Sequence, residues 1–318
     1  KRQLMWVVLG CVAGTFIGMM PGLGPITAIA LMIPVSYSLD PAAGLIMMAG
    51  VYYGAVFGGS TSSILINAPG VASTVATSFD GYPMARDGQA GRALAIAAYS
   101  SFAGGTLGAA ALMLFATTLA GLATRFQSAD YALVLIIALS SIAAFANRGQ
   151  ILKSAIAALI GLMLGTIGTD QSAGVQRFTF GQMDLMEGIS FILLAMATFA
   201  LAEAFRMVVS RDTPAPTQVT TRVRLHEGDA AHIAPTVGRS SVLGFLVGVL
   251  PGAGATLASF FAYDVERRMR SSADRPRGVA APESANNAAC TGSFVPLLTL
   301  GIPGSGTTAV LLGVMLSY

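Results

Sequence analysis

The sequence predicts an all-α, polytopic integral membrane protein made of two inverted-topology repeats that contain broken helices or re-entrant hairpins. The first observation is composition: 54% of the 318 residues are apolar and 10% are charged, whereas a soluble domain has about 25% charged residues. The second is that long stretches, such as 3–39 and 41–79, contain no charged residue. Since about 20 apolar residues span a bilayer, we expect about eight to ten membrane segments. The third is an internal repeat of helix-breaking sequences.

Basic residues in the loops predict the orientation of the segments. Lys and Arg concentrate in 80–92, 147–153 and 206–239, which the positive-inside rule places in the cytoplasm, while 120–130 and 168–187 face outward. They form no basic patch, so the net charge of +3 does not indicate nucleic-acid binding. The expected division of the chain is a first repeat at 1–92, connecting scaffold helices at 93–209, a cytoplasmic linker at 210–239, and a second repeat, incomplete at its C-terminus, at 240–318.

Two short sequences recur in the same order in the two halves. Residues 18–25 (GMMPGLGP) recur at 248–255 (GVLPGAGA), and residues 67–74 (NAPGVAST) recur at 301–308 (GIPGSGTT). The intervening loop around 36–44 has no Lys or Arg, whereas its counterpart at 264–282 has five Arg residues. Opposite charge bias in equivalent loops predicts that they lie on opposite sides of the membrane, as in the inverted repeats of secondary transporters. A parallel duplication with a chance basic cluster is the alternative.

The repeated Pro-Gly sequences predict breaks in membrane helices. Proline lacks a backbone donor and clashes with the preceding turn, and glycine adopts angles that a helix does not use. In hydrocarbon, open backbone is tolerated only where it lines a cavity or is buried in protein. Paired breaks therefore predict a site in which freed carbonyls bind a cation and half-helix N-termini bind an anion such as a carboxylate. The alternative is that the breaks are kinks that serve packing.

The expected ligand-binding residues combine the broken backbone with nearby hydroxyls and amides. For the substrate they are Gly22, Gly24, Ser60, Thr61, Ser62, Asn67, Gly70, Gly252, Gly254, Asn286, Asn287, Gly304 and Ser305. For a Na⁺ ion they are Ser63, Thr74, Ser284, Thr291 and Thr308. Polar groups at membrane depth are costly unless used. An isolated Ser or Thr usually bonds the carbonyl one turn back, so the three asparagines are the stronger candidates, because an amide needs partners at both ends.

Glu283 is the acid beside the second polar cluster. Three roles are open for it: a cation ligand, a proton carrier, or a cap on the helix that follows. Neither cluster contains Lys or Arg, so a bound cation, Na⁺ or H⁺, would help to balance the charge of an anionic substrate.

Other chemistries fit the sequence poorly. The stretch Gly301 to Thr308 resembles a phosphate-binding loop but has Thr307 where the lysine is required. The apolar segments contain no acidic pair, Cys/His pair or zinc-binding motif, so we expect a protein that is not an enzyme and uses no cofactor besides the coupling cation. His226 and His232 lie in the predicted linker and are expected to be solvated. A passive anion channel and an intramembrane enzyme are the alternatives to a transporter.

Several motifs resemble the large membrane subunit of the tripartite tricarboxylate transporters, the TctA family. They are GMMPGLGP at 18–25, YGAVFGGSTSSILINAPG at 53–70, DGYPMAR at 80–86, PGAG at 251–254, PESANNA at 282–288 and PLLTLGIPG at 296–304. The resemblance covers essentially the whole chain, which is similar to the first two-thirds of the longer family members.

The resemblance implies a multi-pass protein of the bacterial inner membrane. It implies two partners: a small TctB-like membrane subunit and a periplasmic TctC-like solute-binding protein that delivers the substrate. The implied activity is import of citrate or other tricarboxylates and small carboxylates by symport with a cation.

Overall fold

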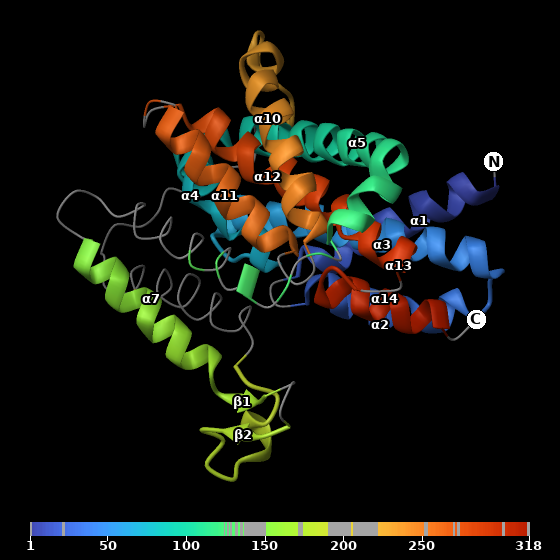
Figure 1. Cartoon of the computed structure of the whole chain (residues 1–318). Helices are drawn as coiled ribbons and strands as arrows, with labels where there is room; N and C mark the ends of the chain where they lie inside the picture. Colours follow the sequence, from blue (N-terminus) through green and yellow to red (C-terminus); the bar gives the residue numbers. More distant parts are fainter. Residues whose placement is uncertain are drawn as a thin grey trace.

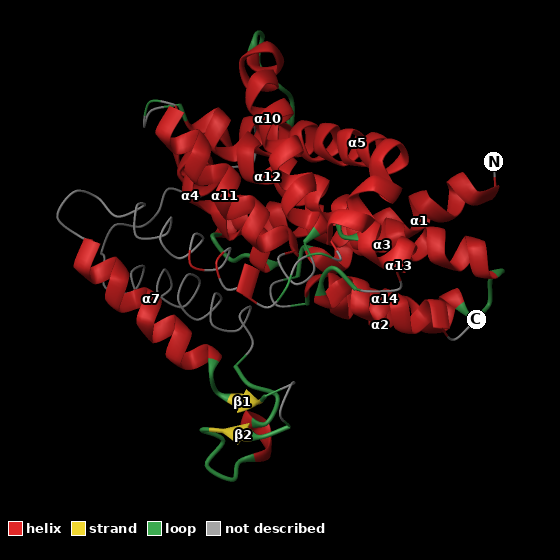
Figure 2. Cartoon of the chain, viewed as in Figure 1, coloured by secondary structure: helices red, strands yellow, loops and turns green. Residues whose placement is uncertain are grey.

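In a computed structural model the protein is almost entirely helical (Figures 1 and 2). The structure describes residues 2–20, 23–123, 125, 127, 129–130, 133, 136, 151–170, 174–189, 205, 222–250, 254–269, 271, 274–300 and 303–316. The predicted site residues Gly22 and Gly252, much of the predicted scaffold at 93–209 and the first part of the predicted linker at 210–239 lie outside the described residues. Among the described residues the helical content confirms the all-α class.

The first half begins with a pair of packed helices. Its elements are α1 (Arg2–Gly18), α2 (Gly24–Ser36), α3 (Pro41–Ile66), the 3₁₀ turn η1 (Ala72–Thr74), α4 (Val75–Met84), the π turn η2 (Ala85–Gln89) and α5 (Ala90–Ala123). Asp40 caps α3 by accepting a hydrogen bond from the backbone N–H of Ala43 at 3.0 Å. Pro41 suits the first position of the helix, where a backbone N–H has no partner within the helix. The helix α3 ends at Asn67, whose φ of 53° is left-handed.

The second half has the same order of elements. They are α10 (Asp229–Val249), α11 (Gly254–Met269), α12 (Arg275–Gly292), α13 (Phe294–Leu300) and α14 (Gly306–Leu316). The helix α10 begins inside the stretch 210–239 that the sequence predicts to be a linker. Between the halves, α7 (Ile151–Gly165), the 3₁₀ turn η3 (Met183–Leu185) and the antiparallel strands β1 (Gly168–Thr169) and β2 (Gln176–Arg177) lie apart from the main bundle (Figure 1).

The predicted breaks fall between described helices. The first break of each half separates α1 from α2 and α10 from α11, and the second separates α3 from η1 and α13 from α14. Gly24 and Gly254, which occupy equivalent positions after the first break, both have left-handed φ angles, 53° and 59°. Only glycine adopts this conformation without strain, so the same residue serves the same turn in both halves.

Small residues let the first two long helices of each half approach closely. A Cβ on Gly14 of α1 would lie 2.2 Å from the carbonyl oxygen of Val51 on α3, and one on Gly244 of α10 would lie 2.2 Å from that of Ala285 on α12. The next turn repeats this contact, with Gly18 against Ala55 and Gly248 against Ala289. The facing helices contribute glycines as well: Gly58 of α3 lies against the backbone of Thr15 on α1, and Gly292 of α12 lies against that of Phe245 on α10. Contacts of this kind are typical of helices packed within membranes.

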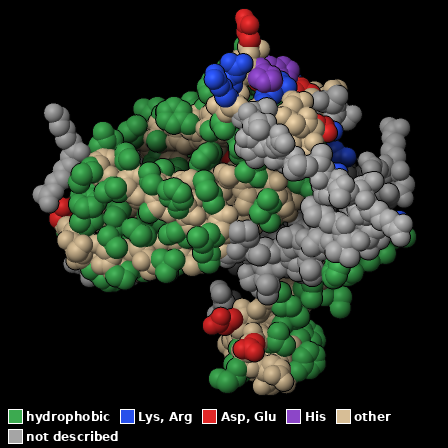
Figure 3. Space-filling model, turned by 180° about the vertical axis from the view of Figure 1, so that it is seen from behind, with side chains coloured by type: hydrophobic (Ala, Val, Ile, Leu, Met, Phe, Trp, Pro, Cys, Tyr) green, Lys and Arg blue, Asp and Glu red, His purple; other side chains and the backbone are tan. Residues whose placement is uncertain are grey.

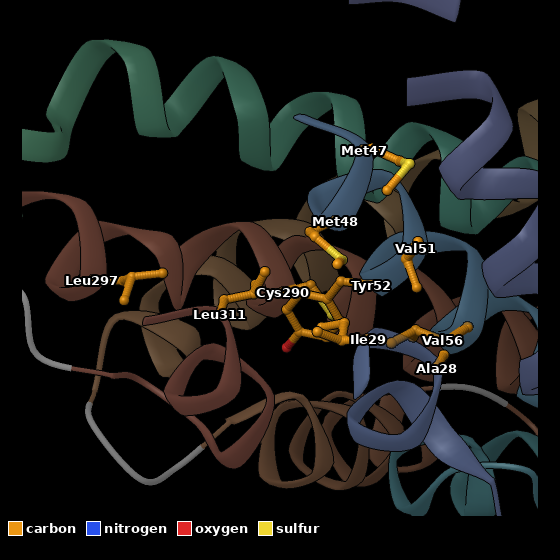
Figure 4. Packing of buried hydrophobic residues seen from close by; sticks show 11 residues of the cluster. Ala28, Ile29, Met47, Met48, Val51, Tyr52, Val56, Cys290, Leu297 and Leu311 are labelled. Carbon is orange, nitrogen blue, oxygen red and sulfur yellow. The ribbon is translucent and has the colours of Figure 1, made fainter. Parts of the chain in front are cut away.

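A hydrophobic core joins the two halves. Figure 4 shows Ile29, Val51 and Tyr52 of the first half beside Cys290, Leu297 and Leu311 of the second. Both cysteines are free, and Cys290 is buried in this core. In Figure 1 the turn between α2 and α3 lies at one end of the bundle, and the end of α11 and the start of α12 lie at the opposite end.

The surface is apolar over much of its area. Within the described residues, two helical stretches are long and apolar enough to cross a membrane, Pro41–Ile66 and Ala72–Phe115. On α5, Phe102, Met113 and Leu114 are 76%, 81% and 74% exposed. Figure 3 shows hydrophobic side chains over one broad face, with charged and His side chains gathered at the α10 end. This distribution indicates a membrane protein.

Candidate functional site

Each half places its first break against the second break of the other half. The helix α2 contacts α14, and Gly306 at the start of α14 lies near Ile26 on α2. On the other side, α11 contacts η1. The helices α2 and α11 each follow the first break of their half, and η1 and α14 each follow the second. In both contacts, therefore, the segment after the first break of one half packs against the segment after the second break of the other.

Hydroxyl groups close the second break of each half with the same hydrogen bond. Thr74 Oγ1 donates to the carbonyl of Val71 at 3.0 Å, and Thr308 Oγ1 donates to that of Ser305 at 2.9 Å. Ser63 donates to Thr74 Oγ1 at 2.8 Å, and the Ser305 N–H donates to Thr308 Oγ1, also at 2.8 Å. The structure therefore brings together Ser63 with Thr74 and Ser305 with Thr308, as local pairs at the starts of α4 and α14.

Other predicted residues are held by their own segment. Ser62 Oγ donates to Gly59 O at 3.1 Å, and Ser284 Oγ donates to Ala280 O, one turn back on α12, at 2.8 Å. Thr61 is partly exposed on α3. The remaining glycines are close to these groups: Gly70 packs against Gly18 and Gly59, Gly304 packs against Ser293, and Gly254 lies beside Ser305. The hydroxyl of Thr291 hydrogen-bonds that of Tyr53 on α3, whereas the hydroxyl of Ser284 bonds its own helix.

The adjacent asparagines on α12 leave one donor unpaired. Asn287 Nδ2 donates to Asn286 Oδ1 at 2.6 Å and to the carbonyl of Glu283 at 3.0 Å. Asn286 is fully buried, and its Nδ2 has no hydrogen-bond partner among the described residues. A buried donor without an acceptor costs about 1–3 kcal/mol. Asn286 is thus a group prepared to donate to an acceptor such as a carboxylate oxygen.

Glu283 does not cap a helix, so that sequence-based alternative is wrong. It lies in the interior of α12, is 0% exposed, and accepts hydrogen bonds from hydroxyls on three other helices. Ser60 on α3 donates to both carboxylate oxygens at 2.7 and 2.8 Å, and Ser101 on α5 donates to Oε2 at 2.8 Å. Thr77 on α4 donates to Oε1.

Thr77 and Ser101 were missed by reasoning from sequence. Both lie in apolar stretches with other small residues, Val75 to Ser78 and Ser100 to Ala103. The sequence feature that marks them is a hydroxyl in a membrane segment, but such a hydroxyl can equally bond a carbonyl of its own helix. The feature does not identify partners of Glu283 reliably, because the buried hydroxyl of Ser100 has no hydrogen-bond partner among the described residues.

The described part of the chain contains no group of three His, Cys, Asp or Glu residues that could hold a metal ion. A cavity of about 410 Å³ lies at the charged end of the molecule, lined by Gly88, Gln89, Arg92, Arg222, Arg224 and His226. None of the predicted site residues lines it. The histidine His226 borders this cavity, and His232 pairs with Asp274 at 2.9 Å.

The fold and the site together define a helical membrane protein in which two similar halves carry interrupted helices. A family model described as tripartite tricarboxylate transporter TctA family matches residues 4–318, and the chain belongs to this family. The chain is 41% identical over 317 residues to an uncharacterized 52.8 kDa protein in the TAR-I ttuC′ 3′ region of Agrobacterium vitis. That match covers 98% of this chain and 63% of the relative, so the chain spans less than two-thirds of the relative's length.

A second relative, an uncharacterized protein in the TAR-II ttuC′ 3′ region of Agrobacterium vitis, is 51% identical over 75 residues. This match covers 22% of the present chain and 31% of the relative. No solved structure matches the chain.

Proposed function

We propose that the chain is the substrate-translocating part of a multi-pass inner-membrane subunit that imports a small carboxylate, citrate or another tricarboxylate, by symport with Na⁺ or H⁺. The small TctB-like subunit completes the membrane complex, and the periplasmic TctC-like binding protein delivers the substrate. The observation that carries the proposal is the pairing of broken helices across the halves, α2 with α14 and α11 with η1.

The substrate anion would bind where helices begin at the breaks. The helix α2 begins after Leu23 without a side-chain cap, and Pro25 in its first turn has no N–H, so Gly24 and Ile26 supply the first backbone donors. Helix N-termini favour negative charge. Asn286 adds the unpaired Nδ2 donor. The proposed substrate residues remain Gly22, Gly24, Ser60, Thr61, Ser62, Asn67, Gly70, Gly252, Gly254, Asn286, Asn287, Gly304 and Ser305.

The coupling cation would bind next to the same breaks. If it is Na⁺, the oxygens of Ser63, Thr74, Ser284, Thr291 and Thr308 are the proposed ligands, because a hydroxyl that donates its hydrogen to a carbonyl keeps lone pairs for a cation. Inverted halves would expose the site to each side in turn. The α2–α3 turn lies at one end of the bundle, and the end of α11 and the start of α12 lie at the other, which supports this arrangement (Figure 1).

Uptake into proteoliposomes tests the proposal. The full-length protein that contains this chain is reconstituted with its small subunit and supplied with its binding protein, and labelled citrate uptake is measured under imposed Na⁺ or H⁺ gradients. Asn287→Ala and Asn67→Ala are expected to abolish uptake without loss of membrane insertion. Ser241→Ala is the matched control, because the buried Ser241 hydroxyl bonds only Val237 of its own helix among the described residues.

Three results would count against the proposal. Wild-type uptake in both asparagine variants would remove these residues from the site. Flux that does not saturate and builds no gradient would favour a passive anion channel instead. If the rate of uptake at low substrate concentration were the same with and without the binding protein, that protein would not be a partner in transport.

A further inference from the structure

A buried carboxylate lies at the junction of four helices. Glu283 on α12 is 0% exposed, and its two oxygens accept hydrogen bonds from Ser60 on α3, Thr77 on α4 and Ser101 on α5. These elements belong to the first half, to the predicted scaffold and to the second half. One ionisable group therefore connects the three parts that a transport cycle would have to move against one another.

Glu283 differs from three other buried acids in the described part of the chain, each of which forms an ion pair with arginine. Asp229 pairs with Arg92, Glu266 with Arg239 and Arg277, and Asp264 with Arg268. Glu283 forms no ion pair among the described residues, and its partners there are neutral hydroxyls. Burying an unpaired charge is costly, and such a group takes up a proton instead.

Several titratable groups lie on the helices packed around α12. They include Tyr53 on α3, Asp80 on α4, Tyr99 on α5, Glu266 on α11 and, on α12 itself, Cys290. The arginines of these helices include Arg92 on α5, Arg239 on α10 and Arg277 on α12, each of which pairs with an acid other than Glu283. Within the described residues no positive side chain neutralises the Glu283 carboxylate.

The spacing of the oxygen atoms fits a proton better than a metal ion. Ser60 Oγ and Ser101 Oγ lie 2.7 and 2.8 Å from the carboxylate oxygens, which are hydrogen-bond distances. A cation held by oxygens at about 2.4 Å keeps those oxygens about 3 Å or more apart. The oxygens around Glu283 would have to separate before an ion such as Na⁺ could enter.

We propose that Glu283 is the proton-binding group that couples carboxylate transport to a proton gradient, an inference that rests on the proposed function. Protonation forms one O–H bond on a carboxylate oxygen, with the proton taken from water on one side of the membrane and released to water on the other. The ionised carboxylate accepts from Ser60, Thr77 and Ser101 together. The protonated group donates to one hydroxyl and accepts fewer bonds, because each hydroxyl can act as donor or acceptor.

This exchange of hydrogen bonds changes how firmly α3, α4 and α5 are held to α12. Charge-assisted hydrogen bonds are stronger than neutral ones. Ionised Glu283 therefore holds the four helices together, and protonated Glu283 releases them, which permits the halves to move. The neutral state also lets the group cross the apolar interior without a net charge.

The test separates accumulation from exchange in proteoliposomes that contain the complete transporter. In Glu283→Gln, accumulation of labelled citrate driven by a pH gradient is expected to be lost, as is substrate-dependent proton uptake measured with a pH-sensitive dye. Exchange of labelled for unlabelled citrate is expected to persist, because glutamine mimics the neutral state. Thr77→Val is expected to move the pH profile of uptake to higher pH, because the ionised form loses a donor.

Ser78→Ala is the matched control for Thr77→Val. Ser78 is the next residue on α4, is buried, and donates to Val75 of its own helix rather than to Glu283. The pH profile of this variant is expected to match that of the wild type. An equal shift in both variants would overturn the assignment.

Infrared spectroscopy gives a readout that does not depend on transport. The wild type is expected to show the band of a protonated carboxyl group that titrates with pH and is absent from Glu283→Gln. Proton-driven accumulation in Glu283→Gln, an unchanged infrared band, or loss of exchange together with accumulation in correctly inserted protein would each overturn the proposal. Wild-type uptake driven by Na⁺ alone, without proton uptake, would also overturn it while leaving the proposed function intact. A wild type that transports no carboxylate under any gradient would instead count against the proposed function.

Discussion

The helix pair α1–α3 and the helix pair α10–α12 share a packing scheme but not a polar chemistry. Gly14 meets Val51 in the first pair as Gly244 meets Ala285 in the second. The register that aligns residues 18–25 with 248–255 places Gly14 opposite Gly244. The register that aligns residues 67–74 with 301–308 places Val51 opposite Ala285. The internal repeat seen in sequence is thus also a repeat of backbone contacts.

The second of these registers shows where the two halves differ. It places Tyr52 and Tyr53 opposite Asn286 and Asn287, and Ala49 opposite Glu283. The first half is apolar and aromatic where the second carries amides and an acid. The helix packing is duplicated, but the two asparagines and the glutamate have no counterparts at the equivalent positions of the first half. The two halves therefore contribute different side chains.

The largest expected effect comes from filling the glycine contacts. A Cβ on Gly14 or Gly244 would lie 2.2 Å from a backbone oxygen of the facing helix. Backbone cannot yield as a flexible side chain does, so Gly14→Val and Gly244→Val are each expected to lower the free energy of unfolding by about 3 kcal/mol or more. Thermal unfolding in detergent measures the loss.

The control for this prediction lies on the same helix. Gly238 of α10 has no atom within 4 Å of its virtual Cβ. Gly238→Ala is expected to stabilise the helix by about 0.5–1 kcal/mol, because glycine loses more entropy on folding than alanine does. If either half tolerates valine at its glycine contact, the shared packing scheme is refuted.

The breaks and the repeat were predictable because they are local. Proline and glycine at residues 18–25 end one helix and start the next wherever the sequence is placed, and α1 and α2 end and begin there. The role of Glu283 as a cap was wrong for a reason that is also local. Pro282 marks a helix start in many sequences, but here Pro276 occupies that position, and Pro282 is tolerated in the interior of α12.

The surroundings of Glu283 could not be predicted, because they depend on tertiary packing. Ser101 and Thr77 lie 182 and 206 residues away in sequence from the carboxylate that they contact. Nothing in either segment indicates which helix it faces. The same limit applies to the predicted cation ligands, whose hydroxyls the structure divides between separate local pairs.

A smaller effect is expected from the ion pair between Arg92 and Asp229. Arg92 Nε and Nη2 donate to Asp229 at 3.0 and 2.6 Å, which joins α5 to the start of α10 in the stretch predicted to be cytoplasmic. Arg92 holds the pKa of Asp229 below its usual range. The stabilisation is therefore present above the unfolded-state pKa and is lost as pH falls through the lower folded-state value.

Asp229→Asn is accordingly expected to lower the free energy of unfolding by about 1–3 kcal/mol at neutral pH. The difference from the wild type should shrink below about pH 4, the ordinary pKa of an aspartate. Unfolding measured across the acid range tests this. Asp87→Asn, which breaks the exposed pair with Arg275, should cost less than about 1 kcal/mol. If Asp229→Asn and Asp87→Asn lowered the free energy of unfolding equally, the buried pair would contribute no more to stability than the exposed one.

The smallest effect concerns the threonines that close the second break in each half. Thr74 and Thr308 make the same bond to the carbonyl three residues back, so Thr74→Val and Thr308→Val are each expected to cost about 1 kcal/mol, the net value of one hydrogen bond. Each hydroxyl also accepts one hydrogen bond, Thr74 from Ser63 and Thr308 from the Ser305 N–H, so the two losses should be similar. Thr→Ser keeps the hydroxyl and should restore most of the stability in both halves. A loss confined to one threonine would mean that the second breaks share sequence but not structure, which would limit the repeat to the helix pairs that precede them.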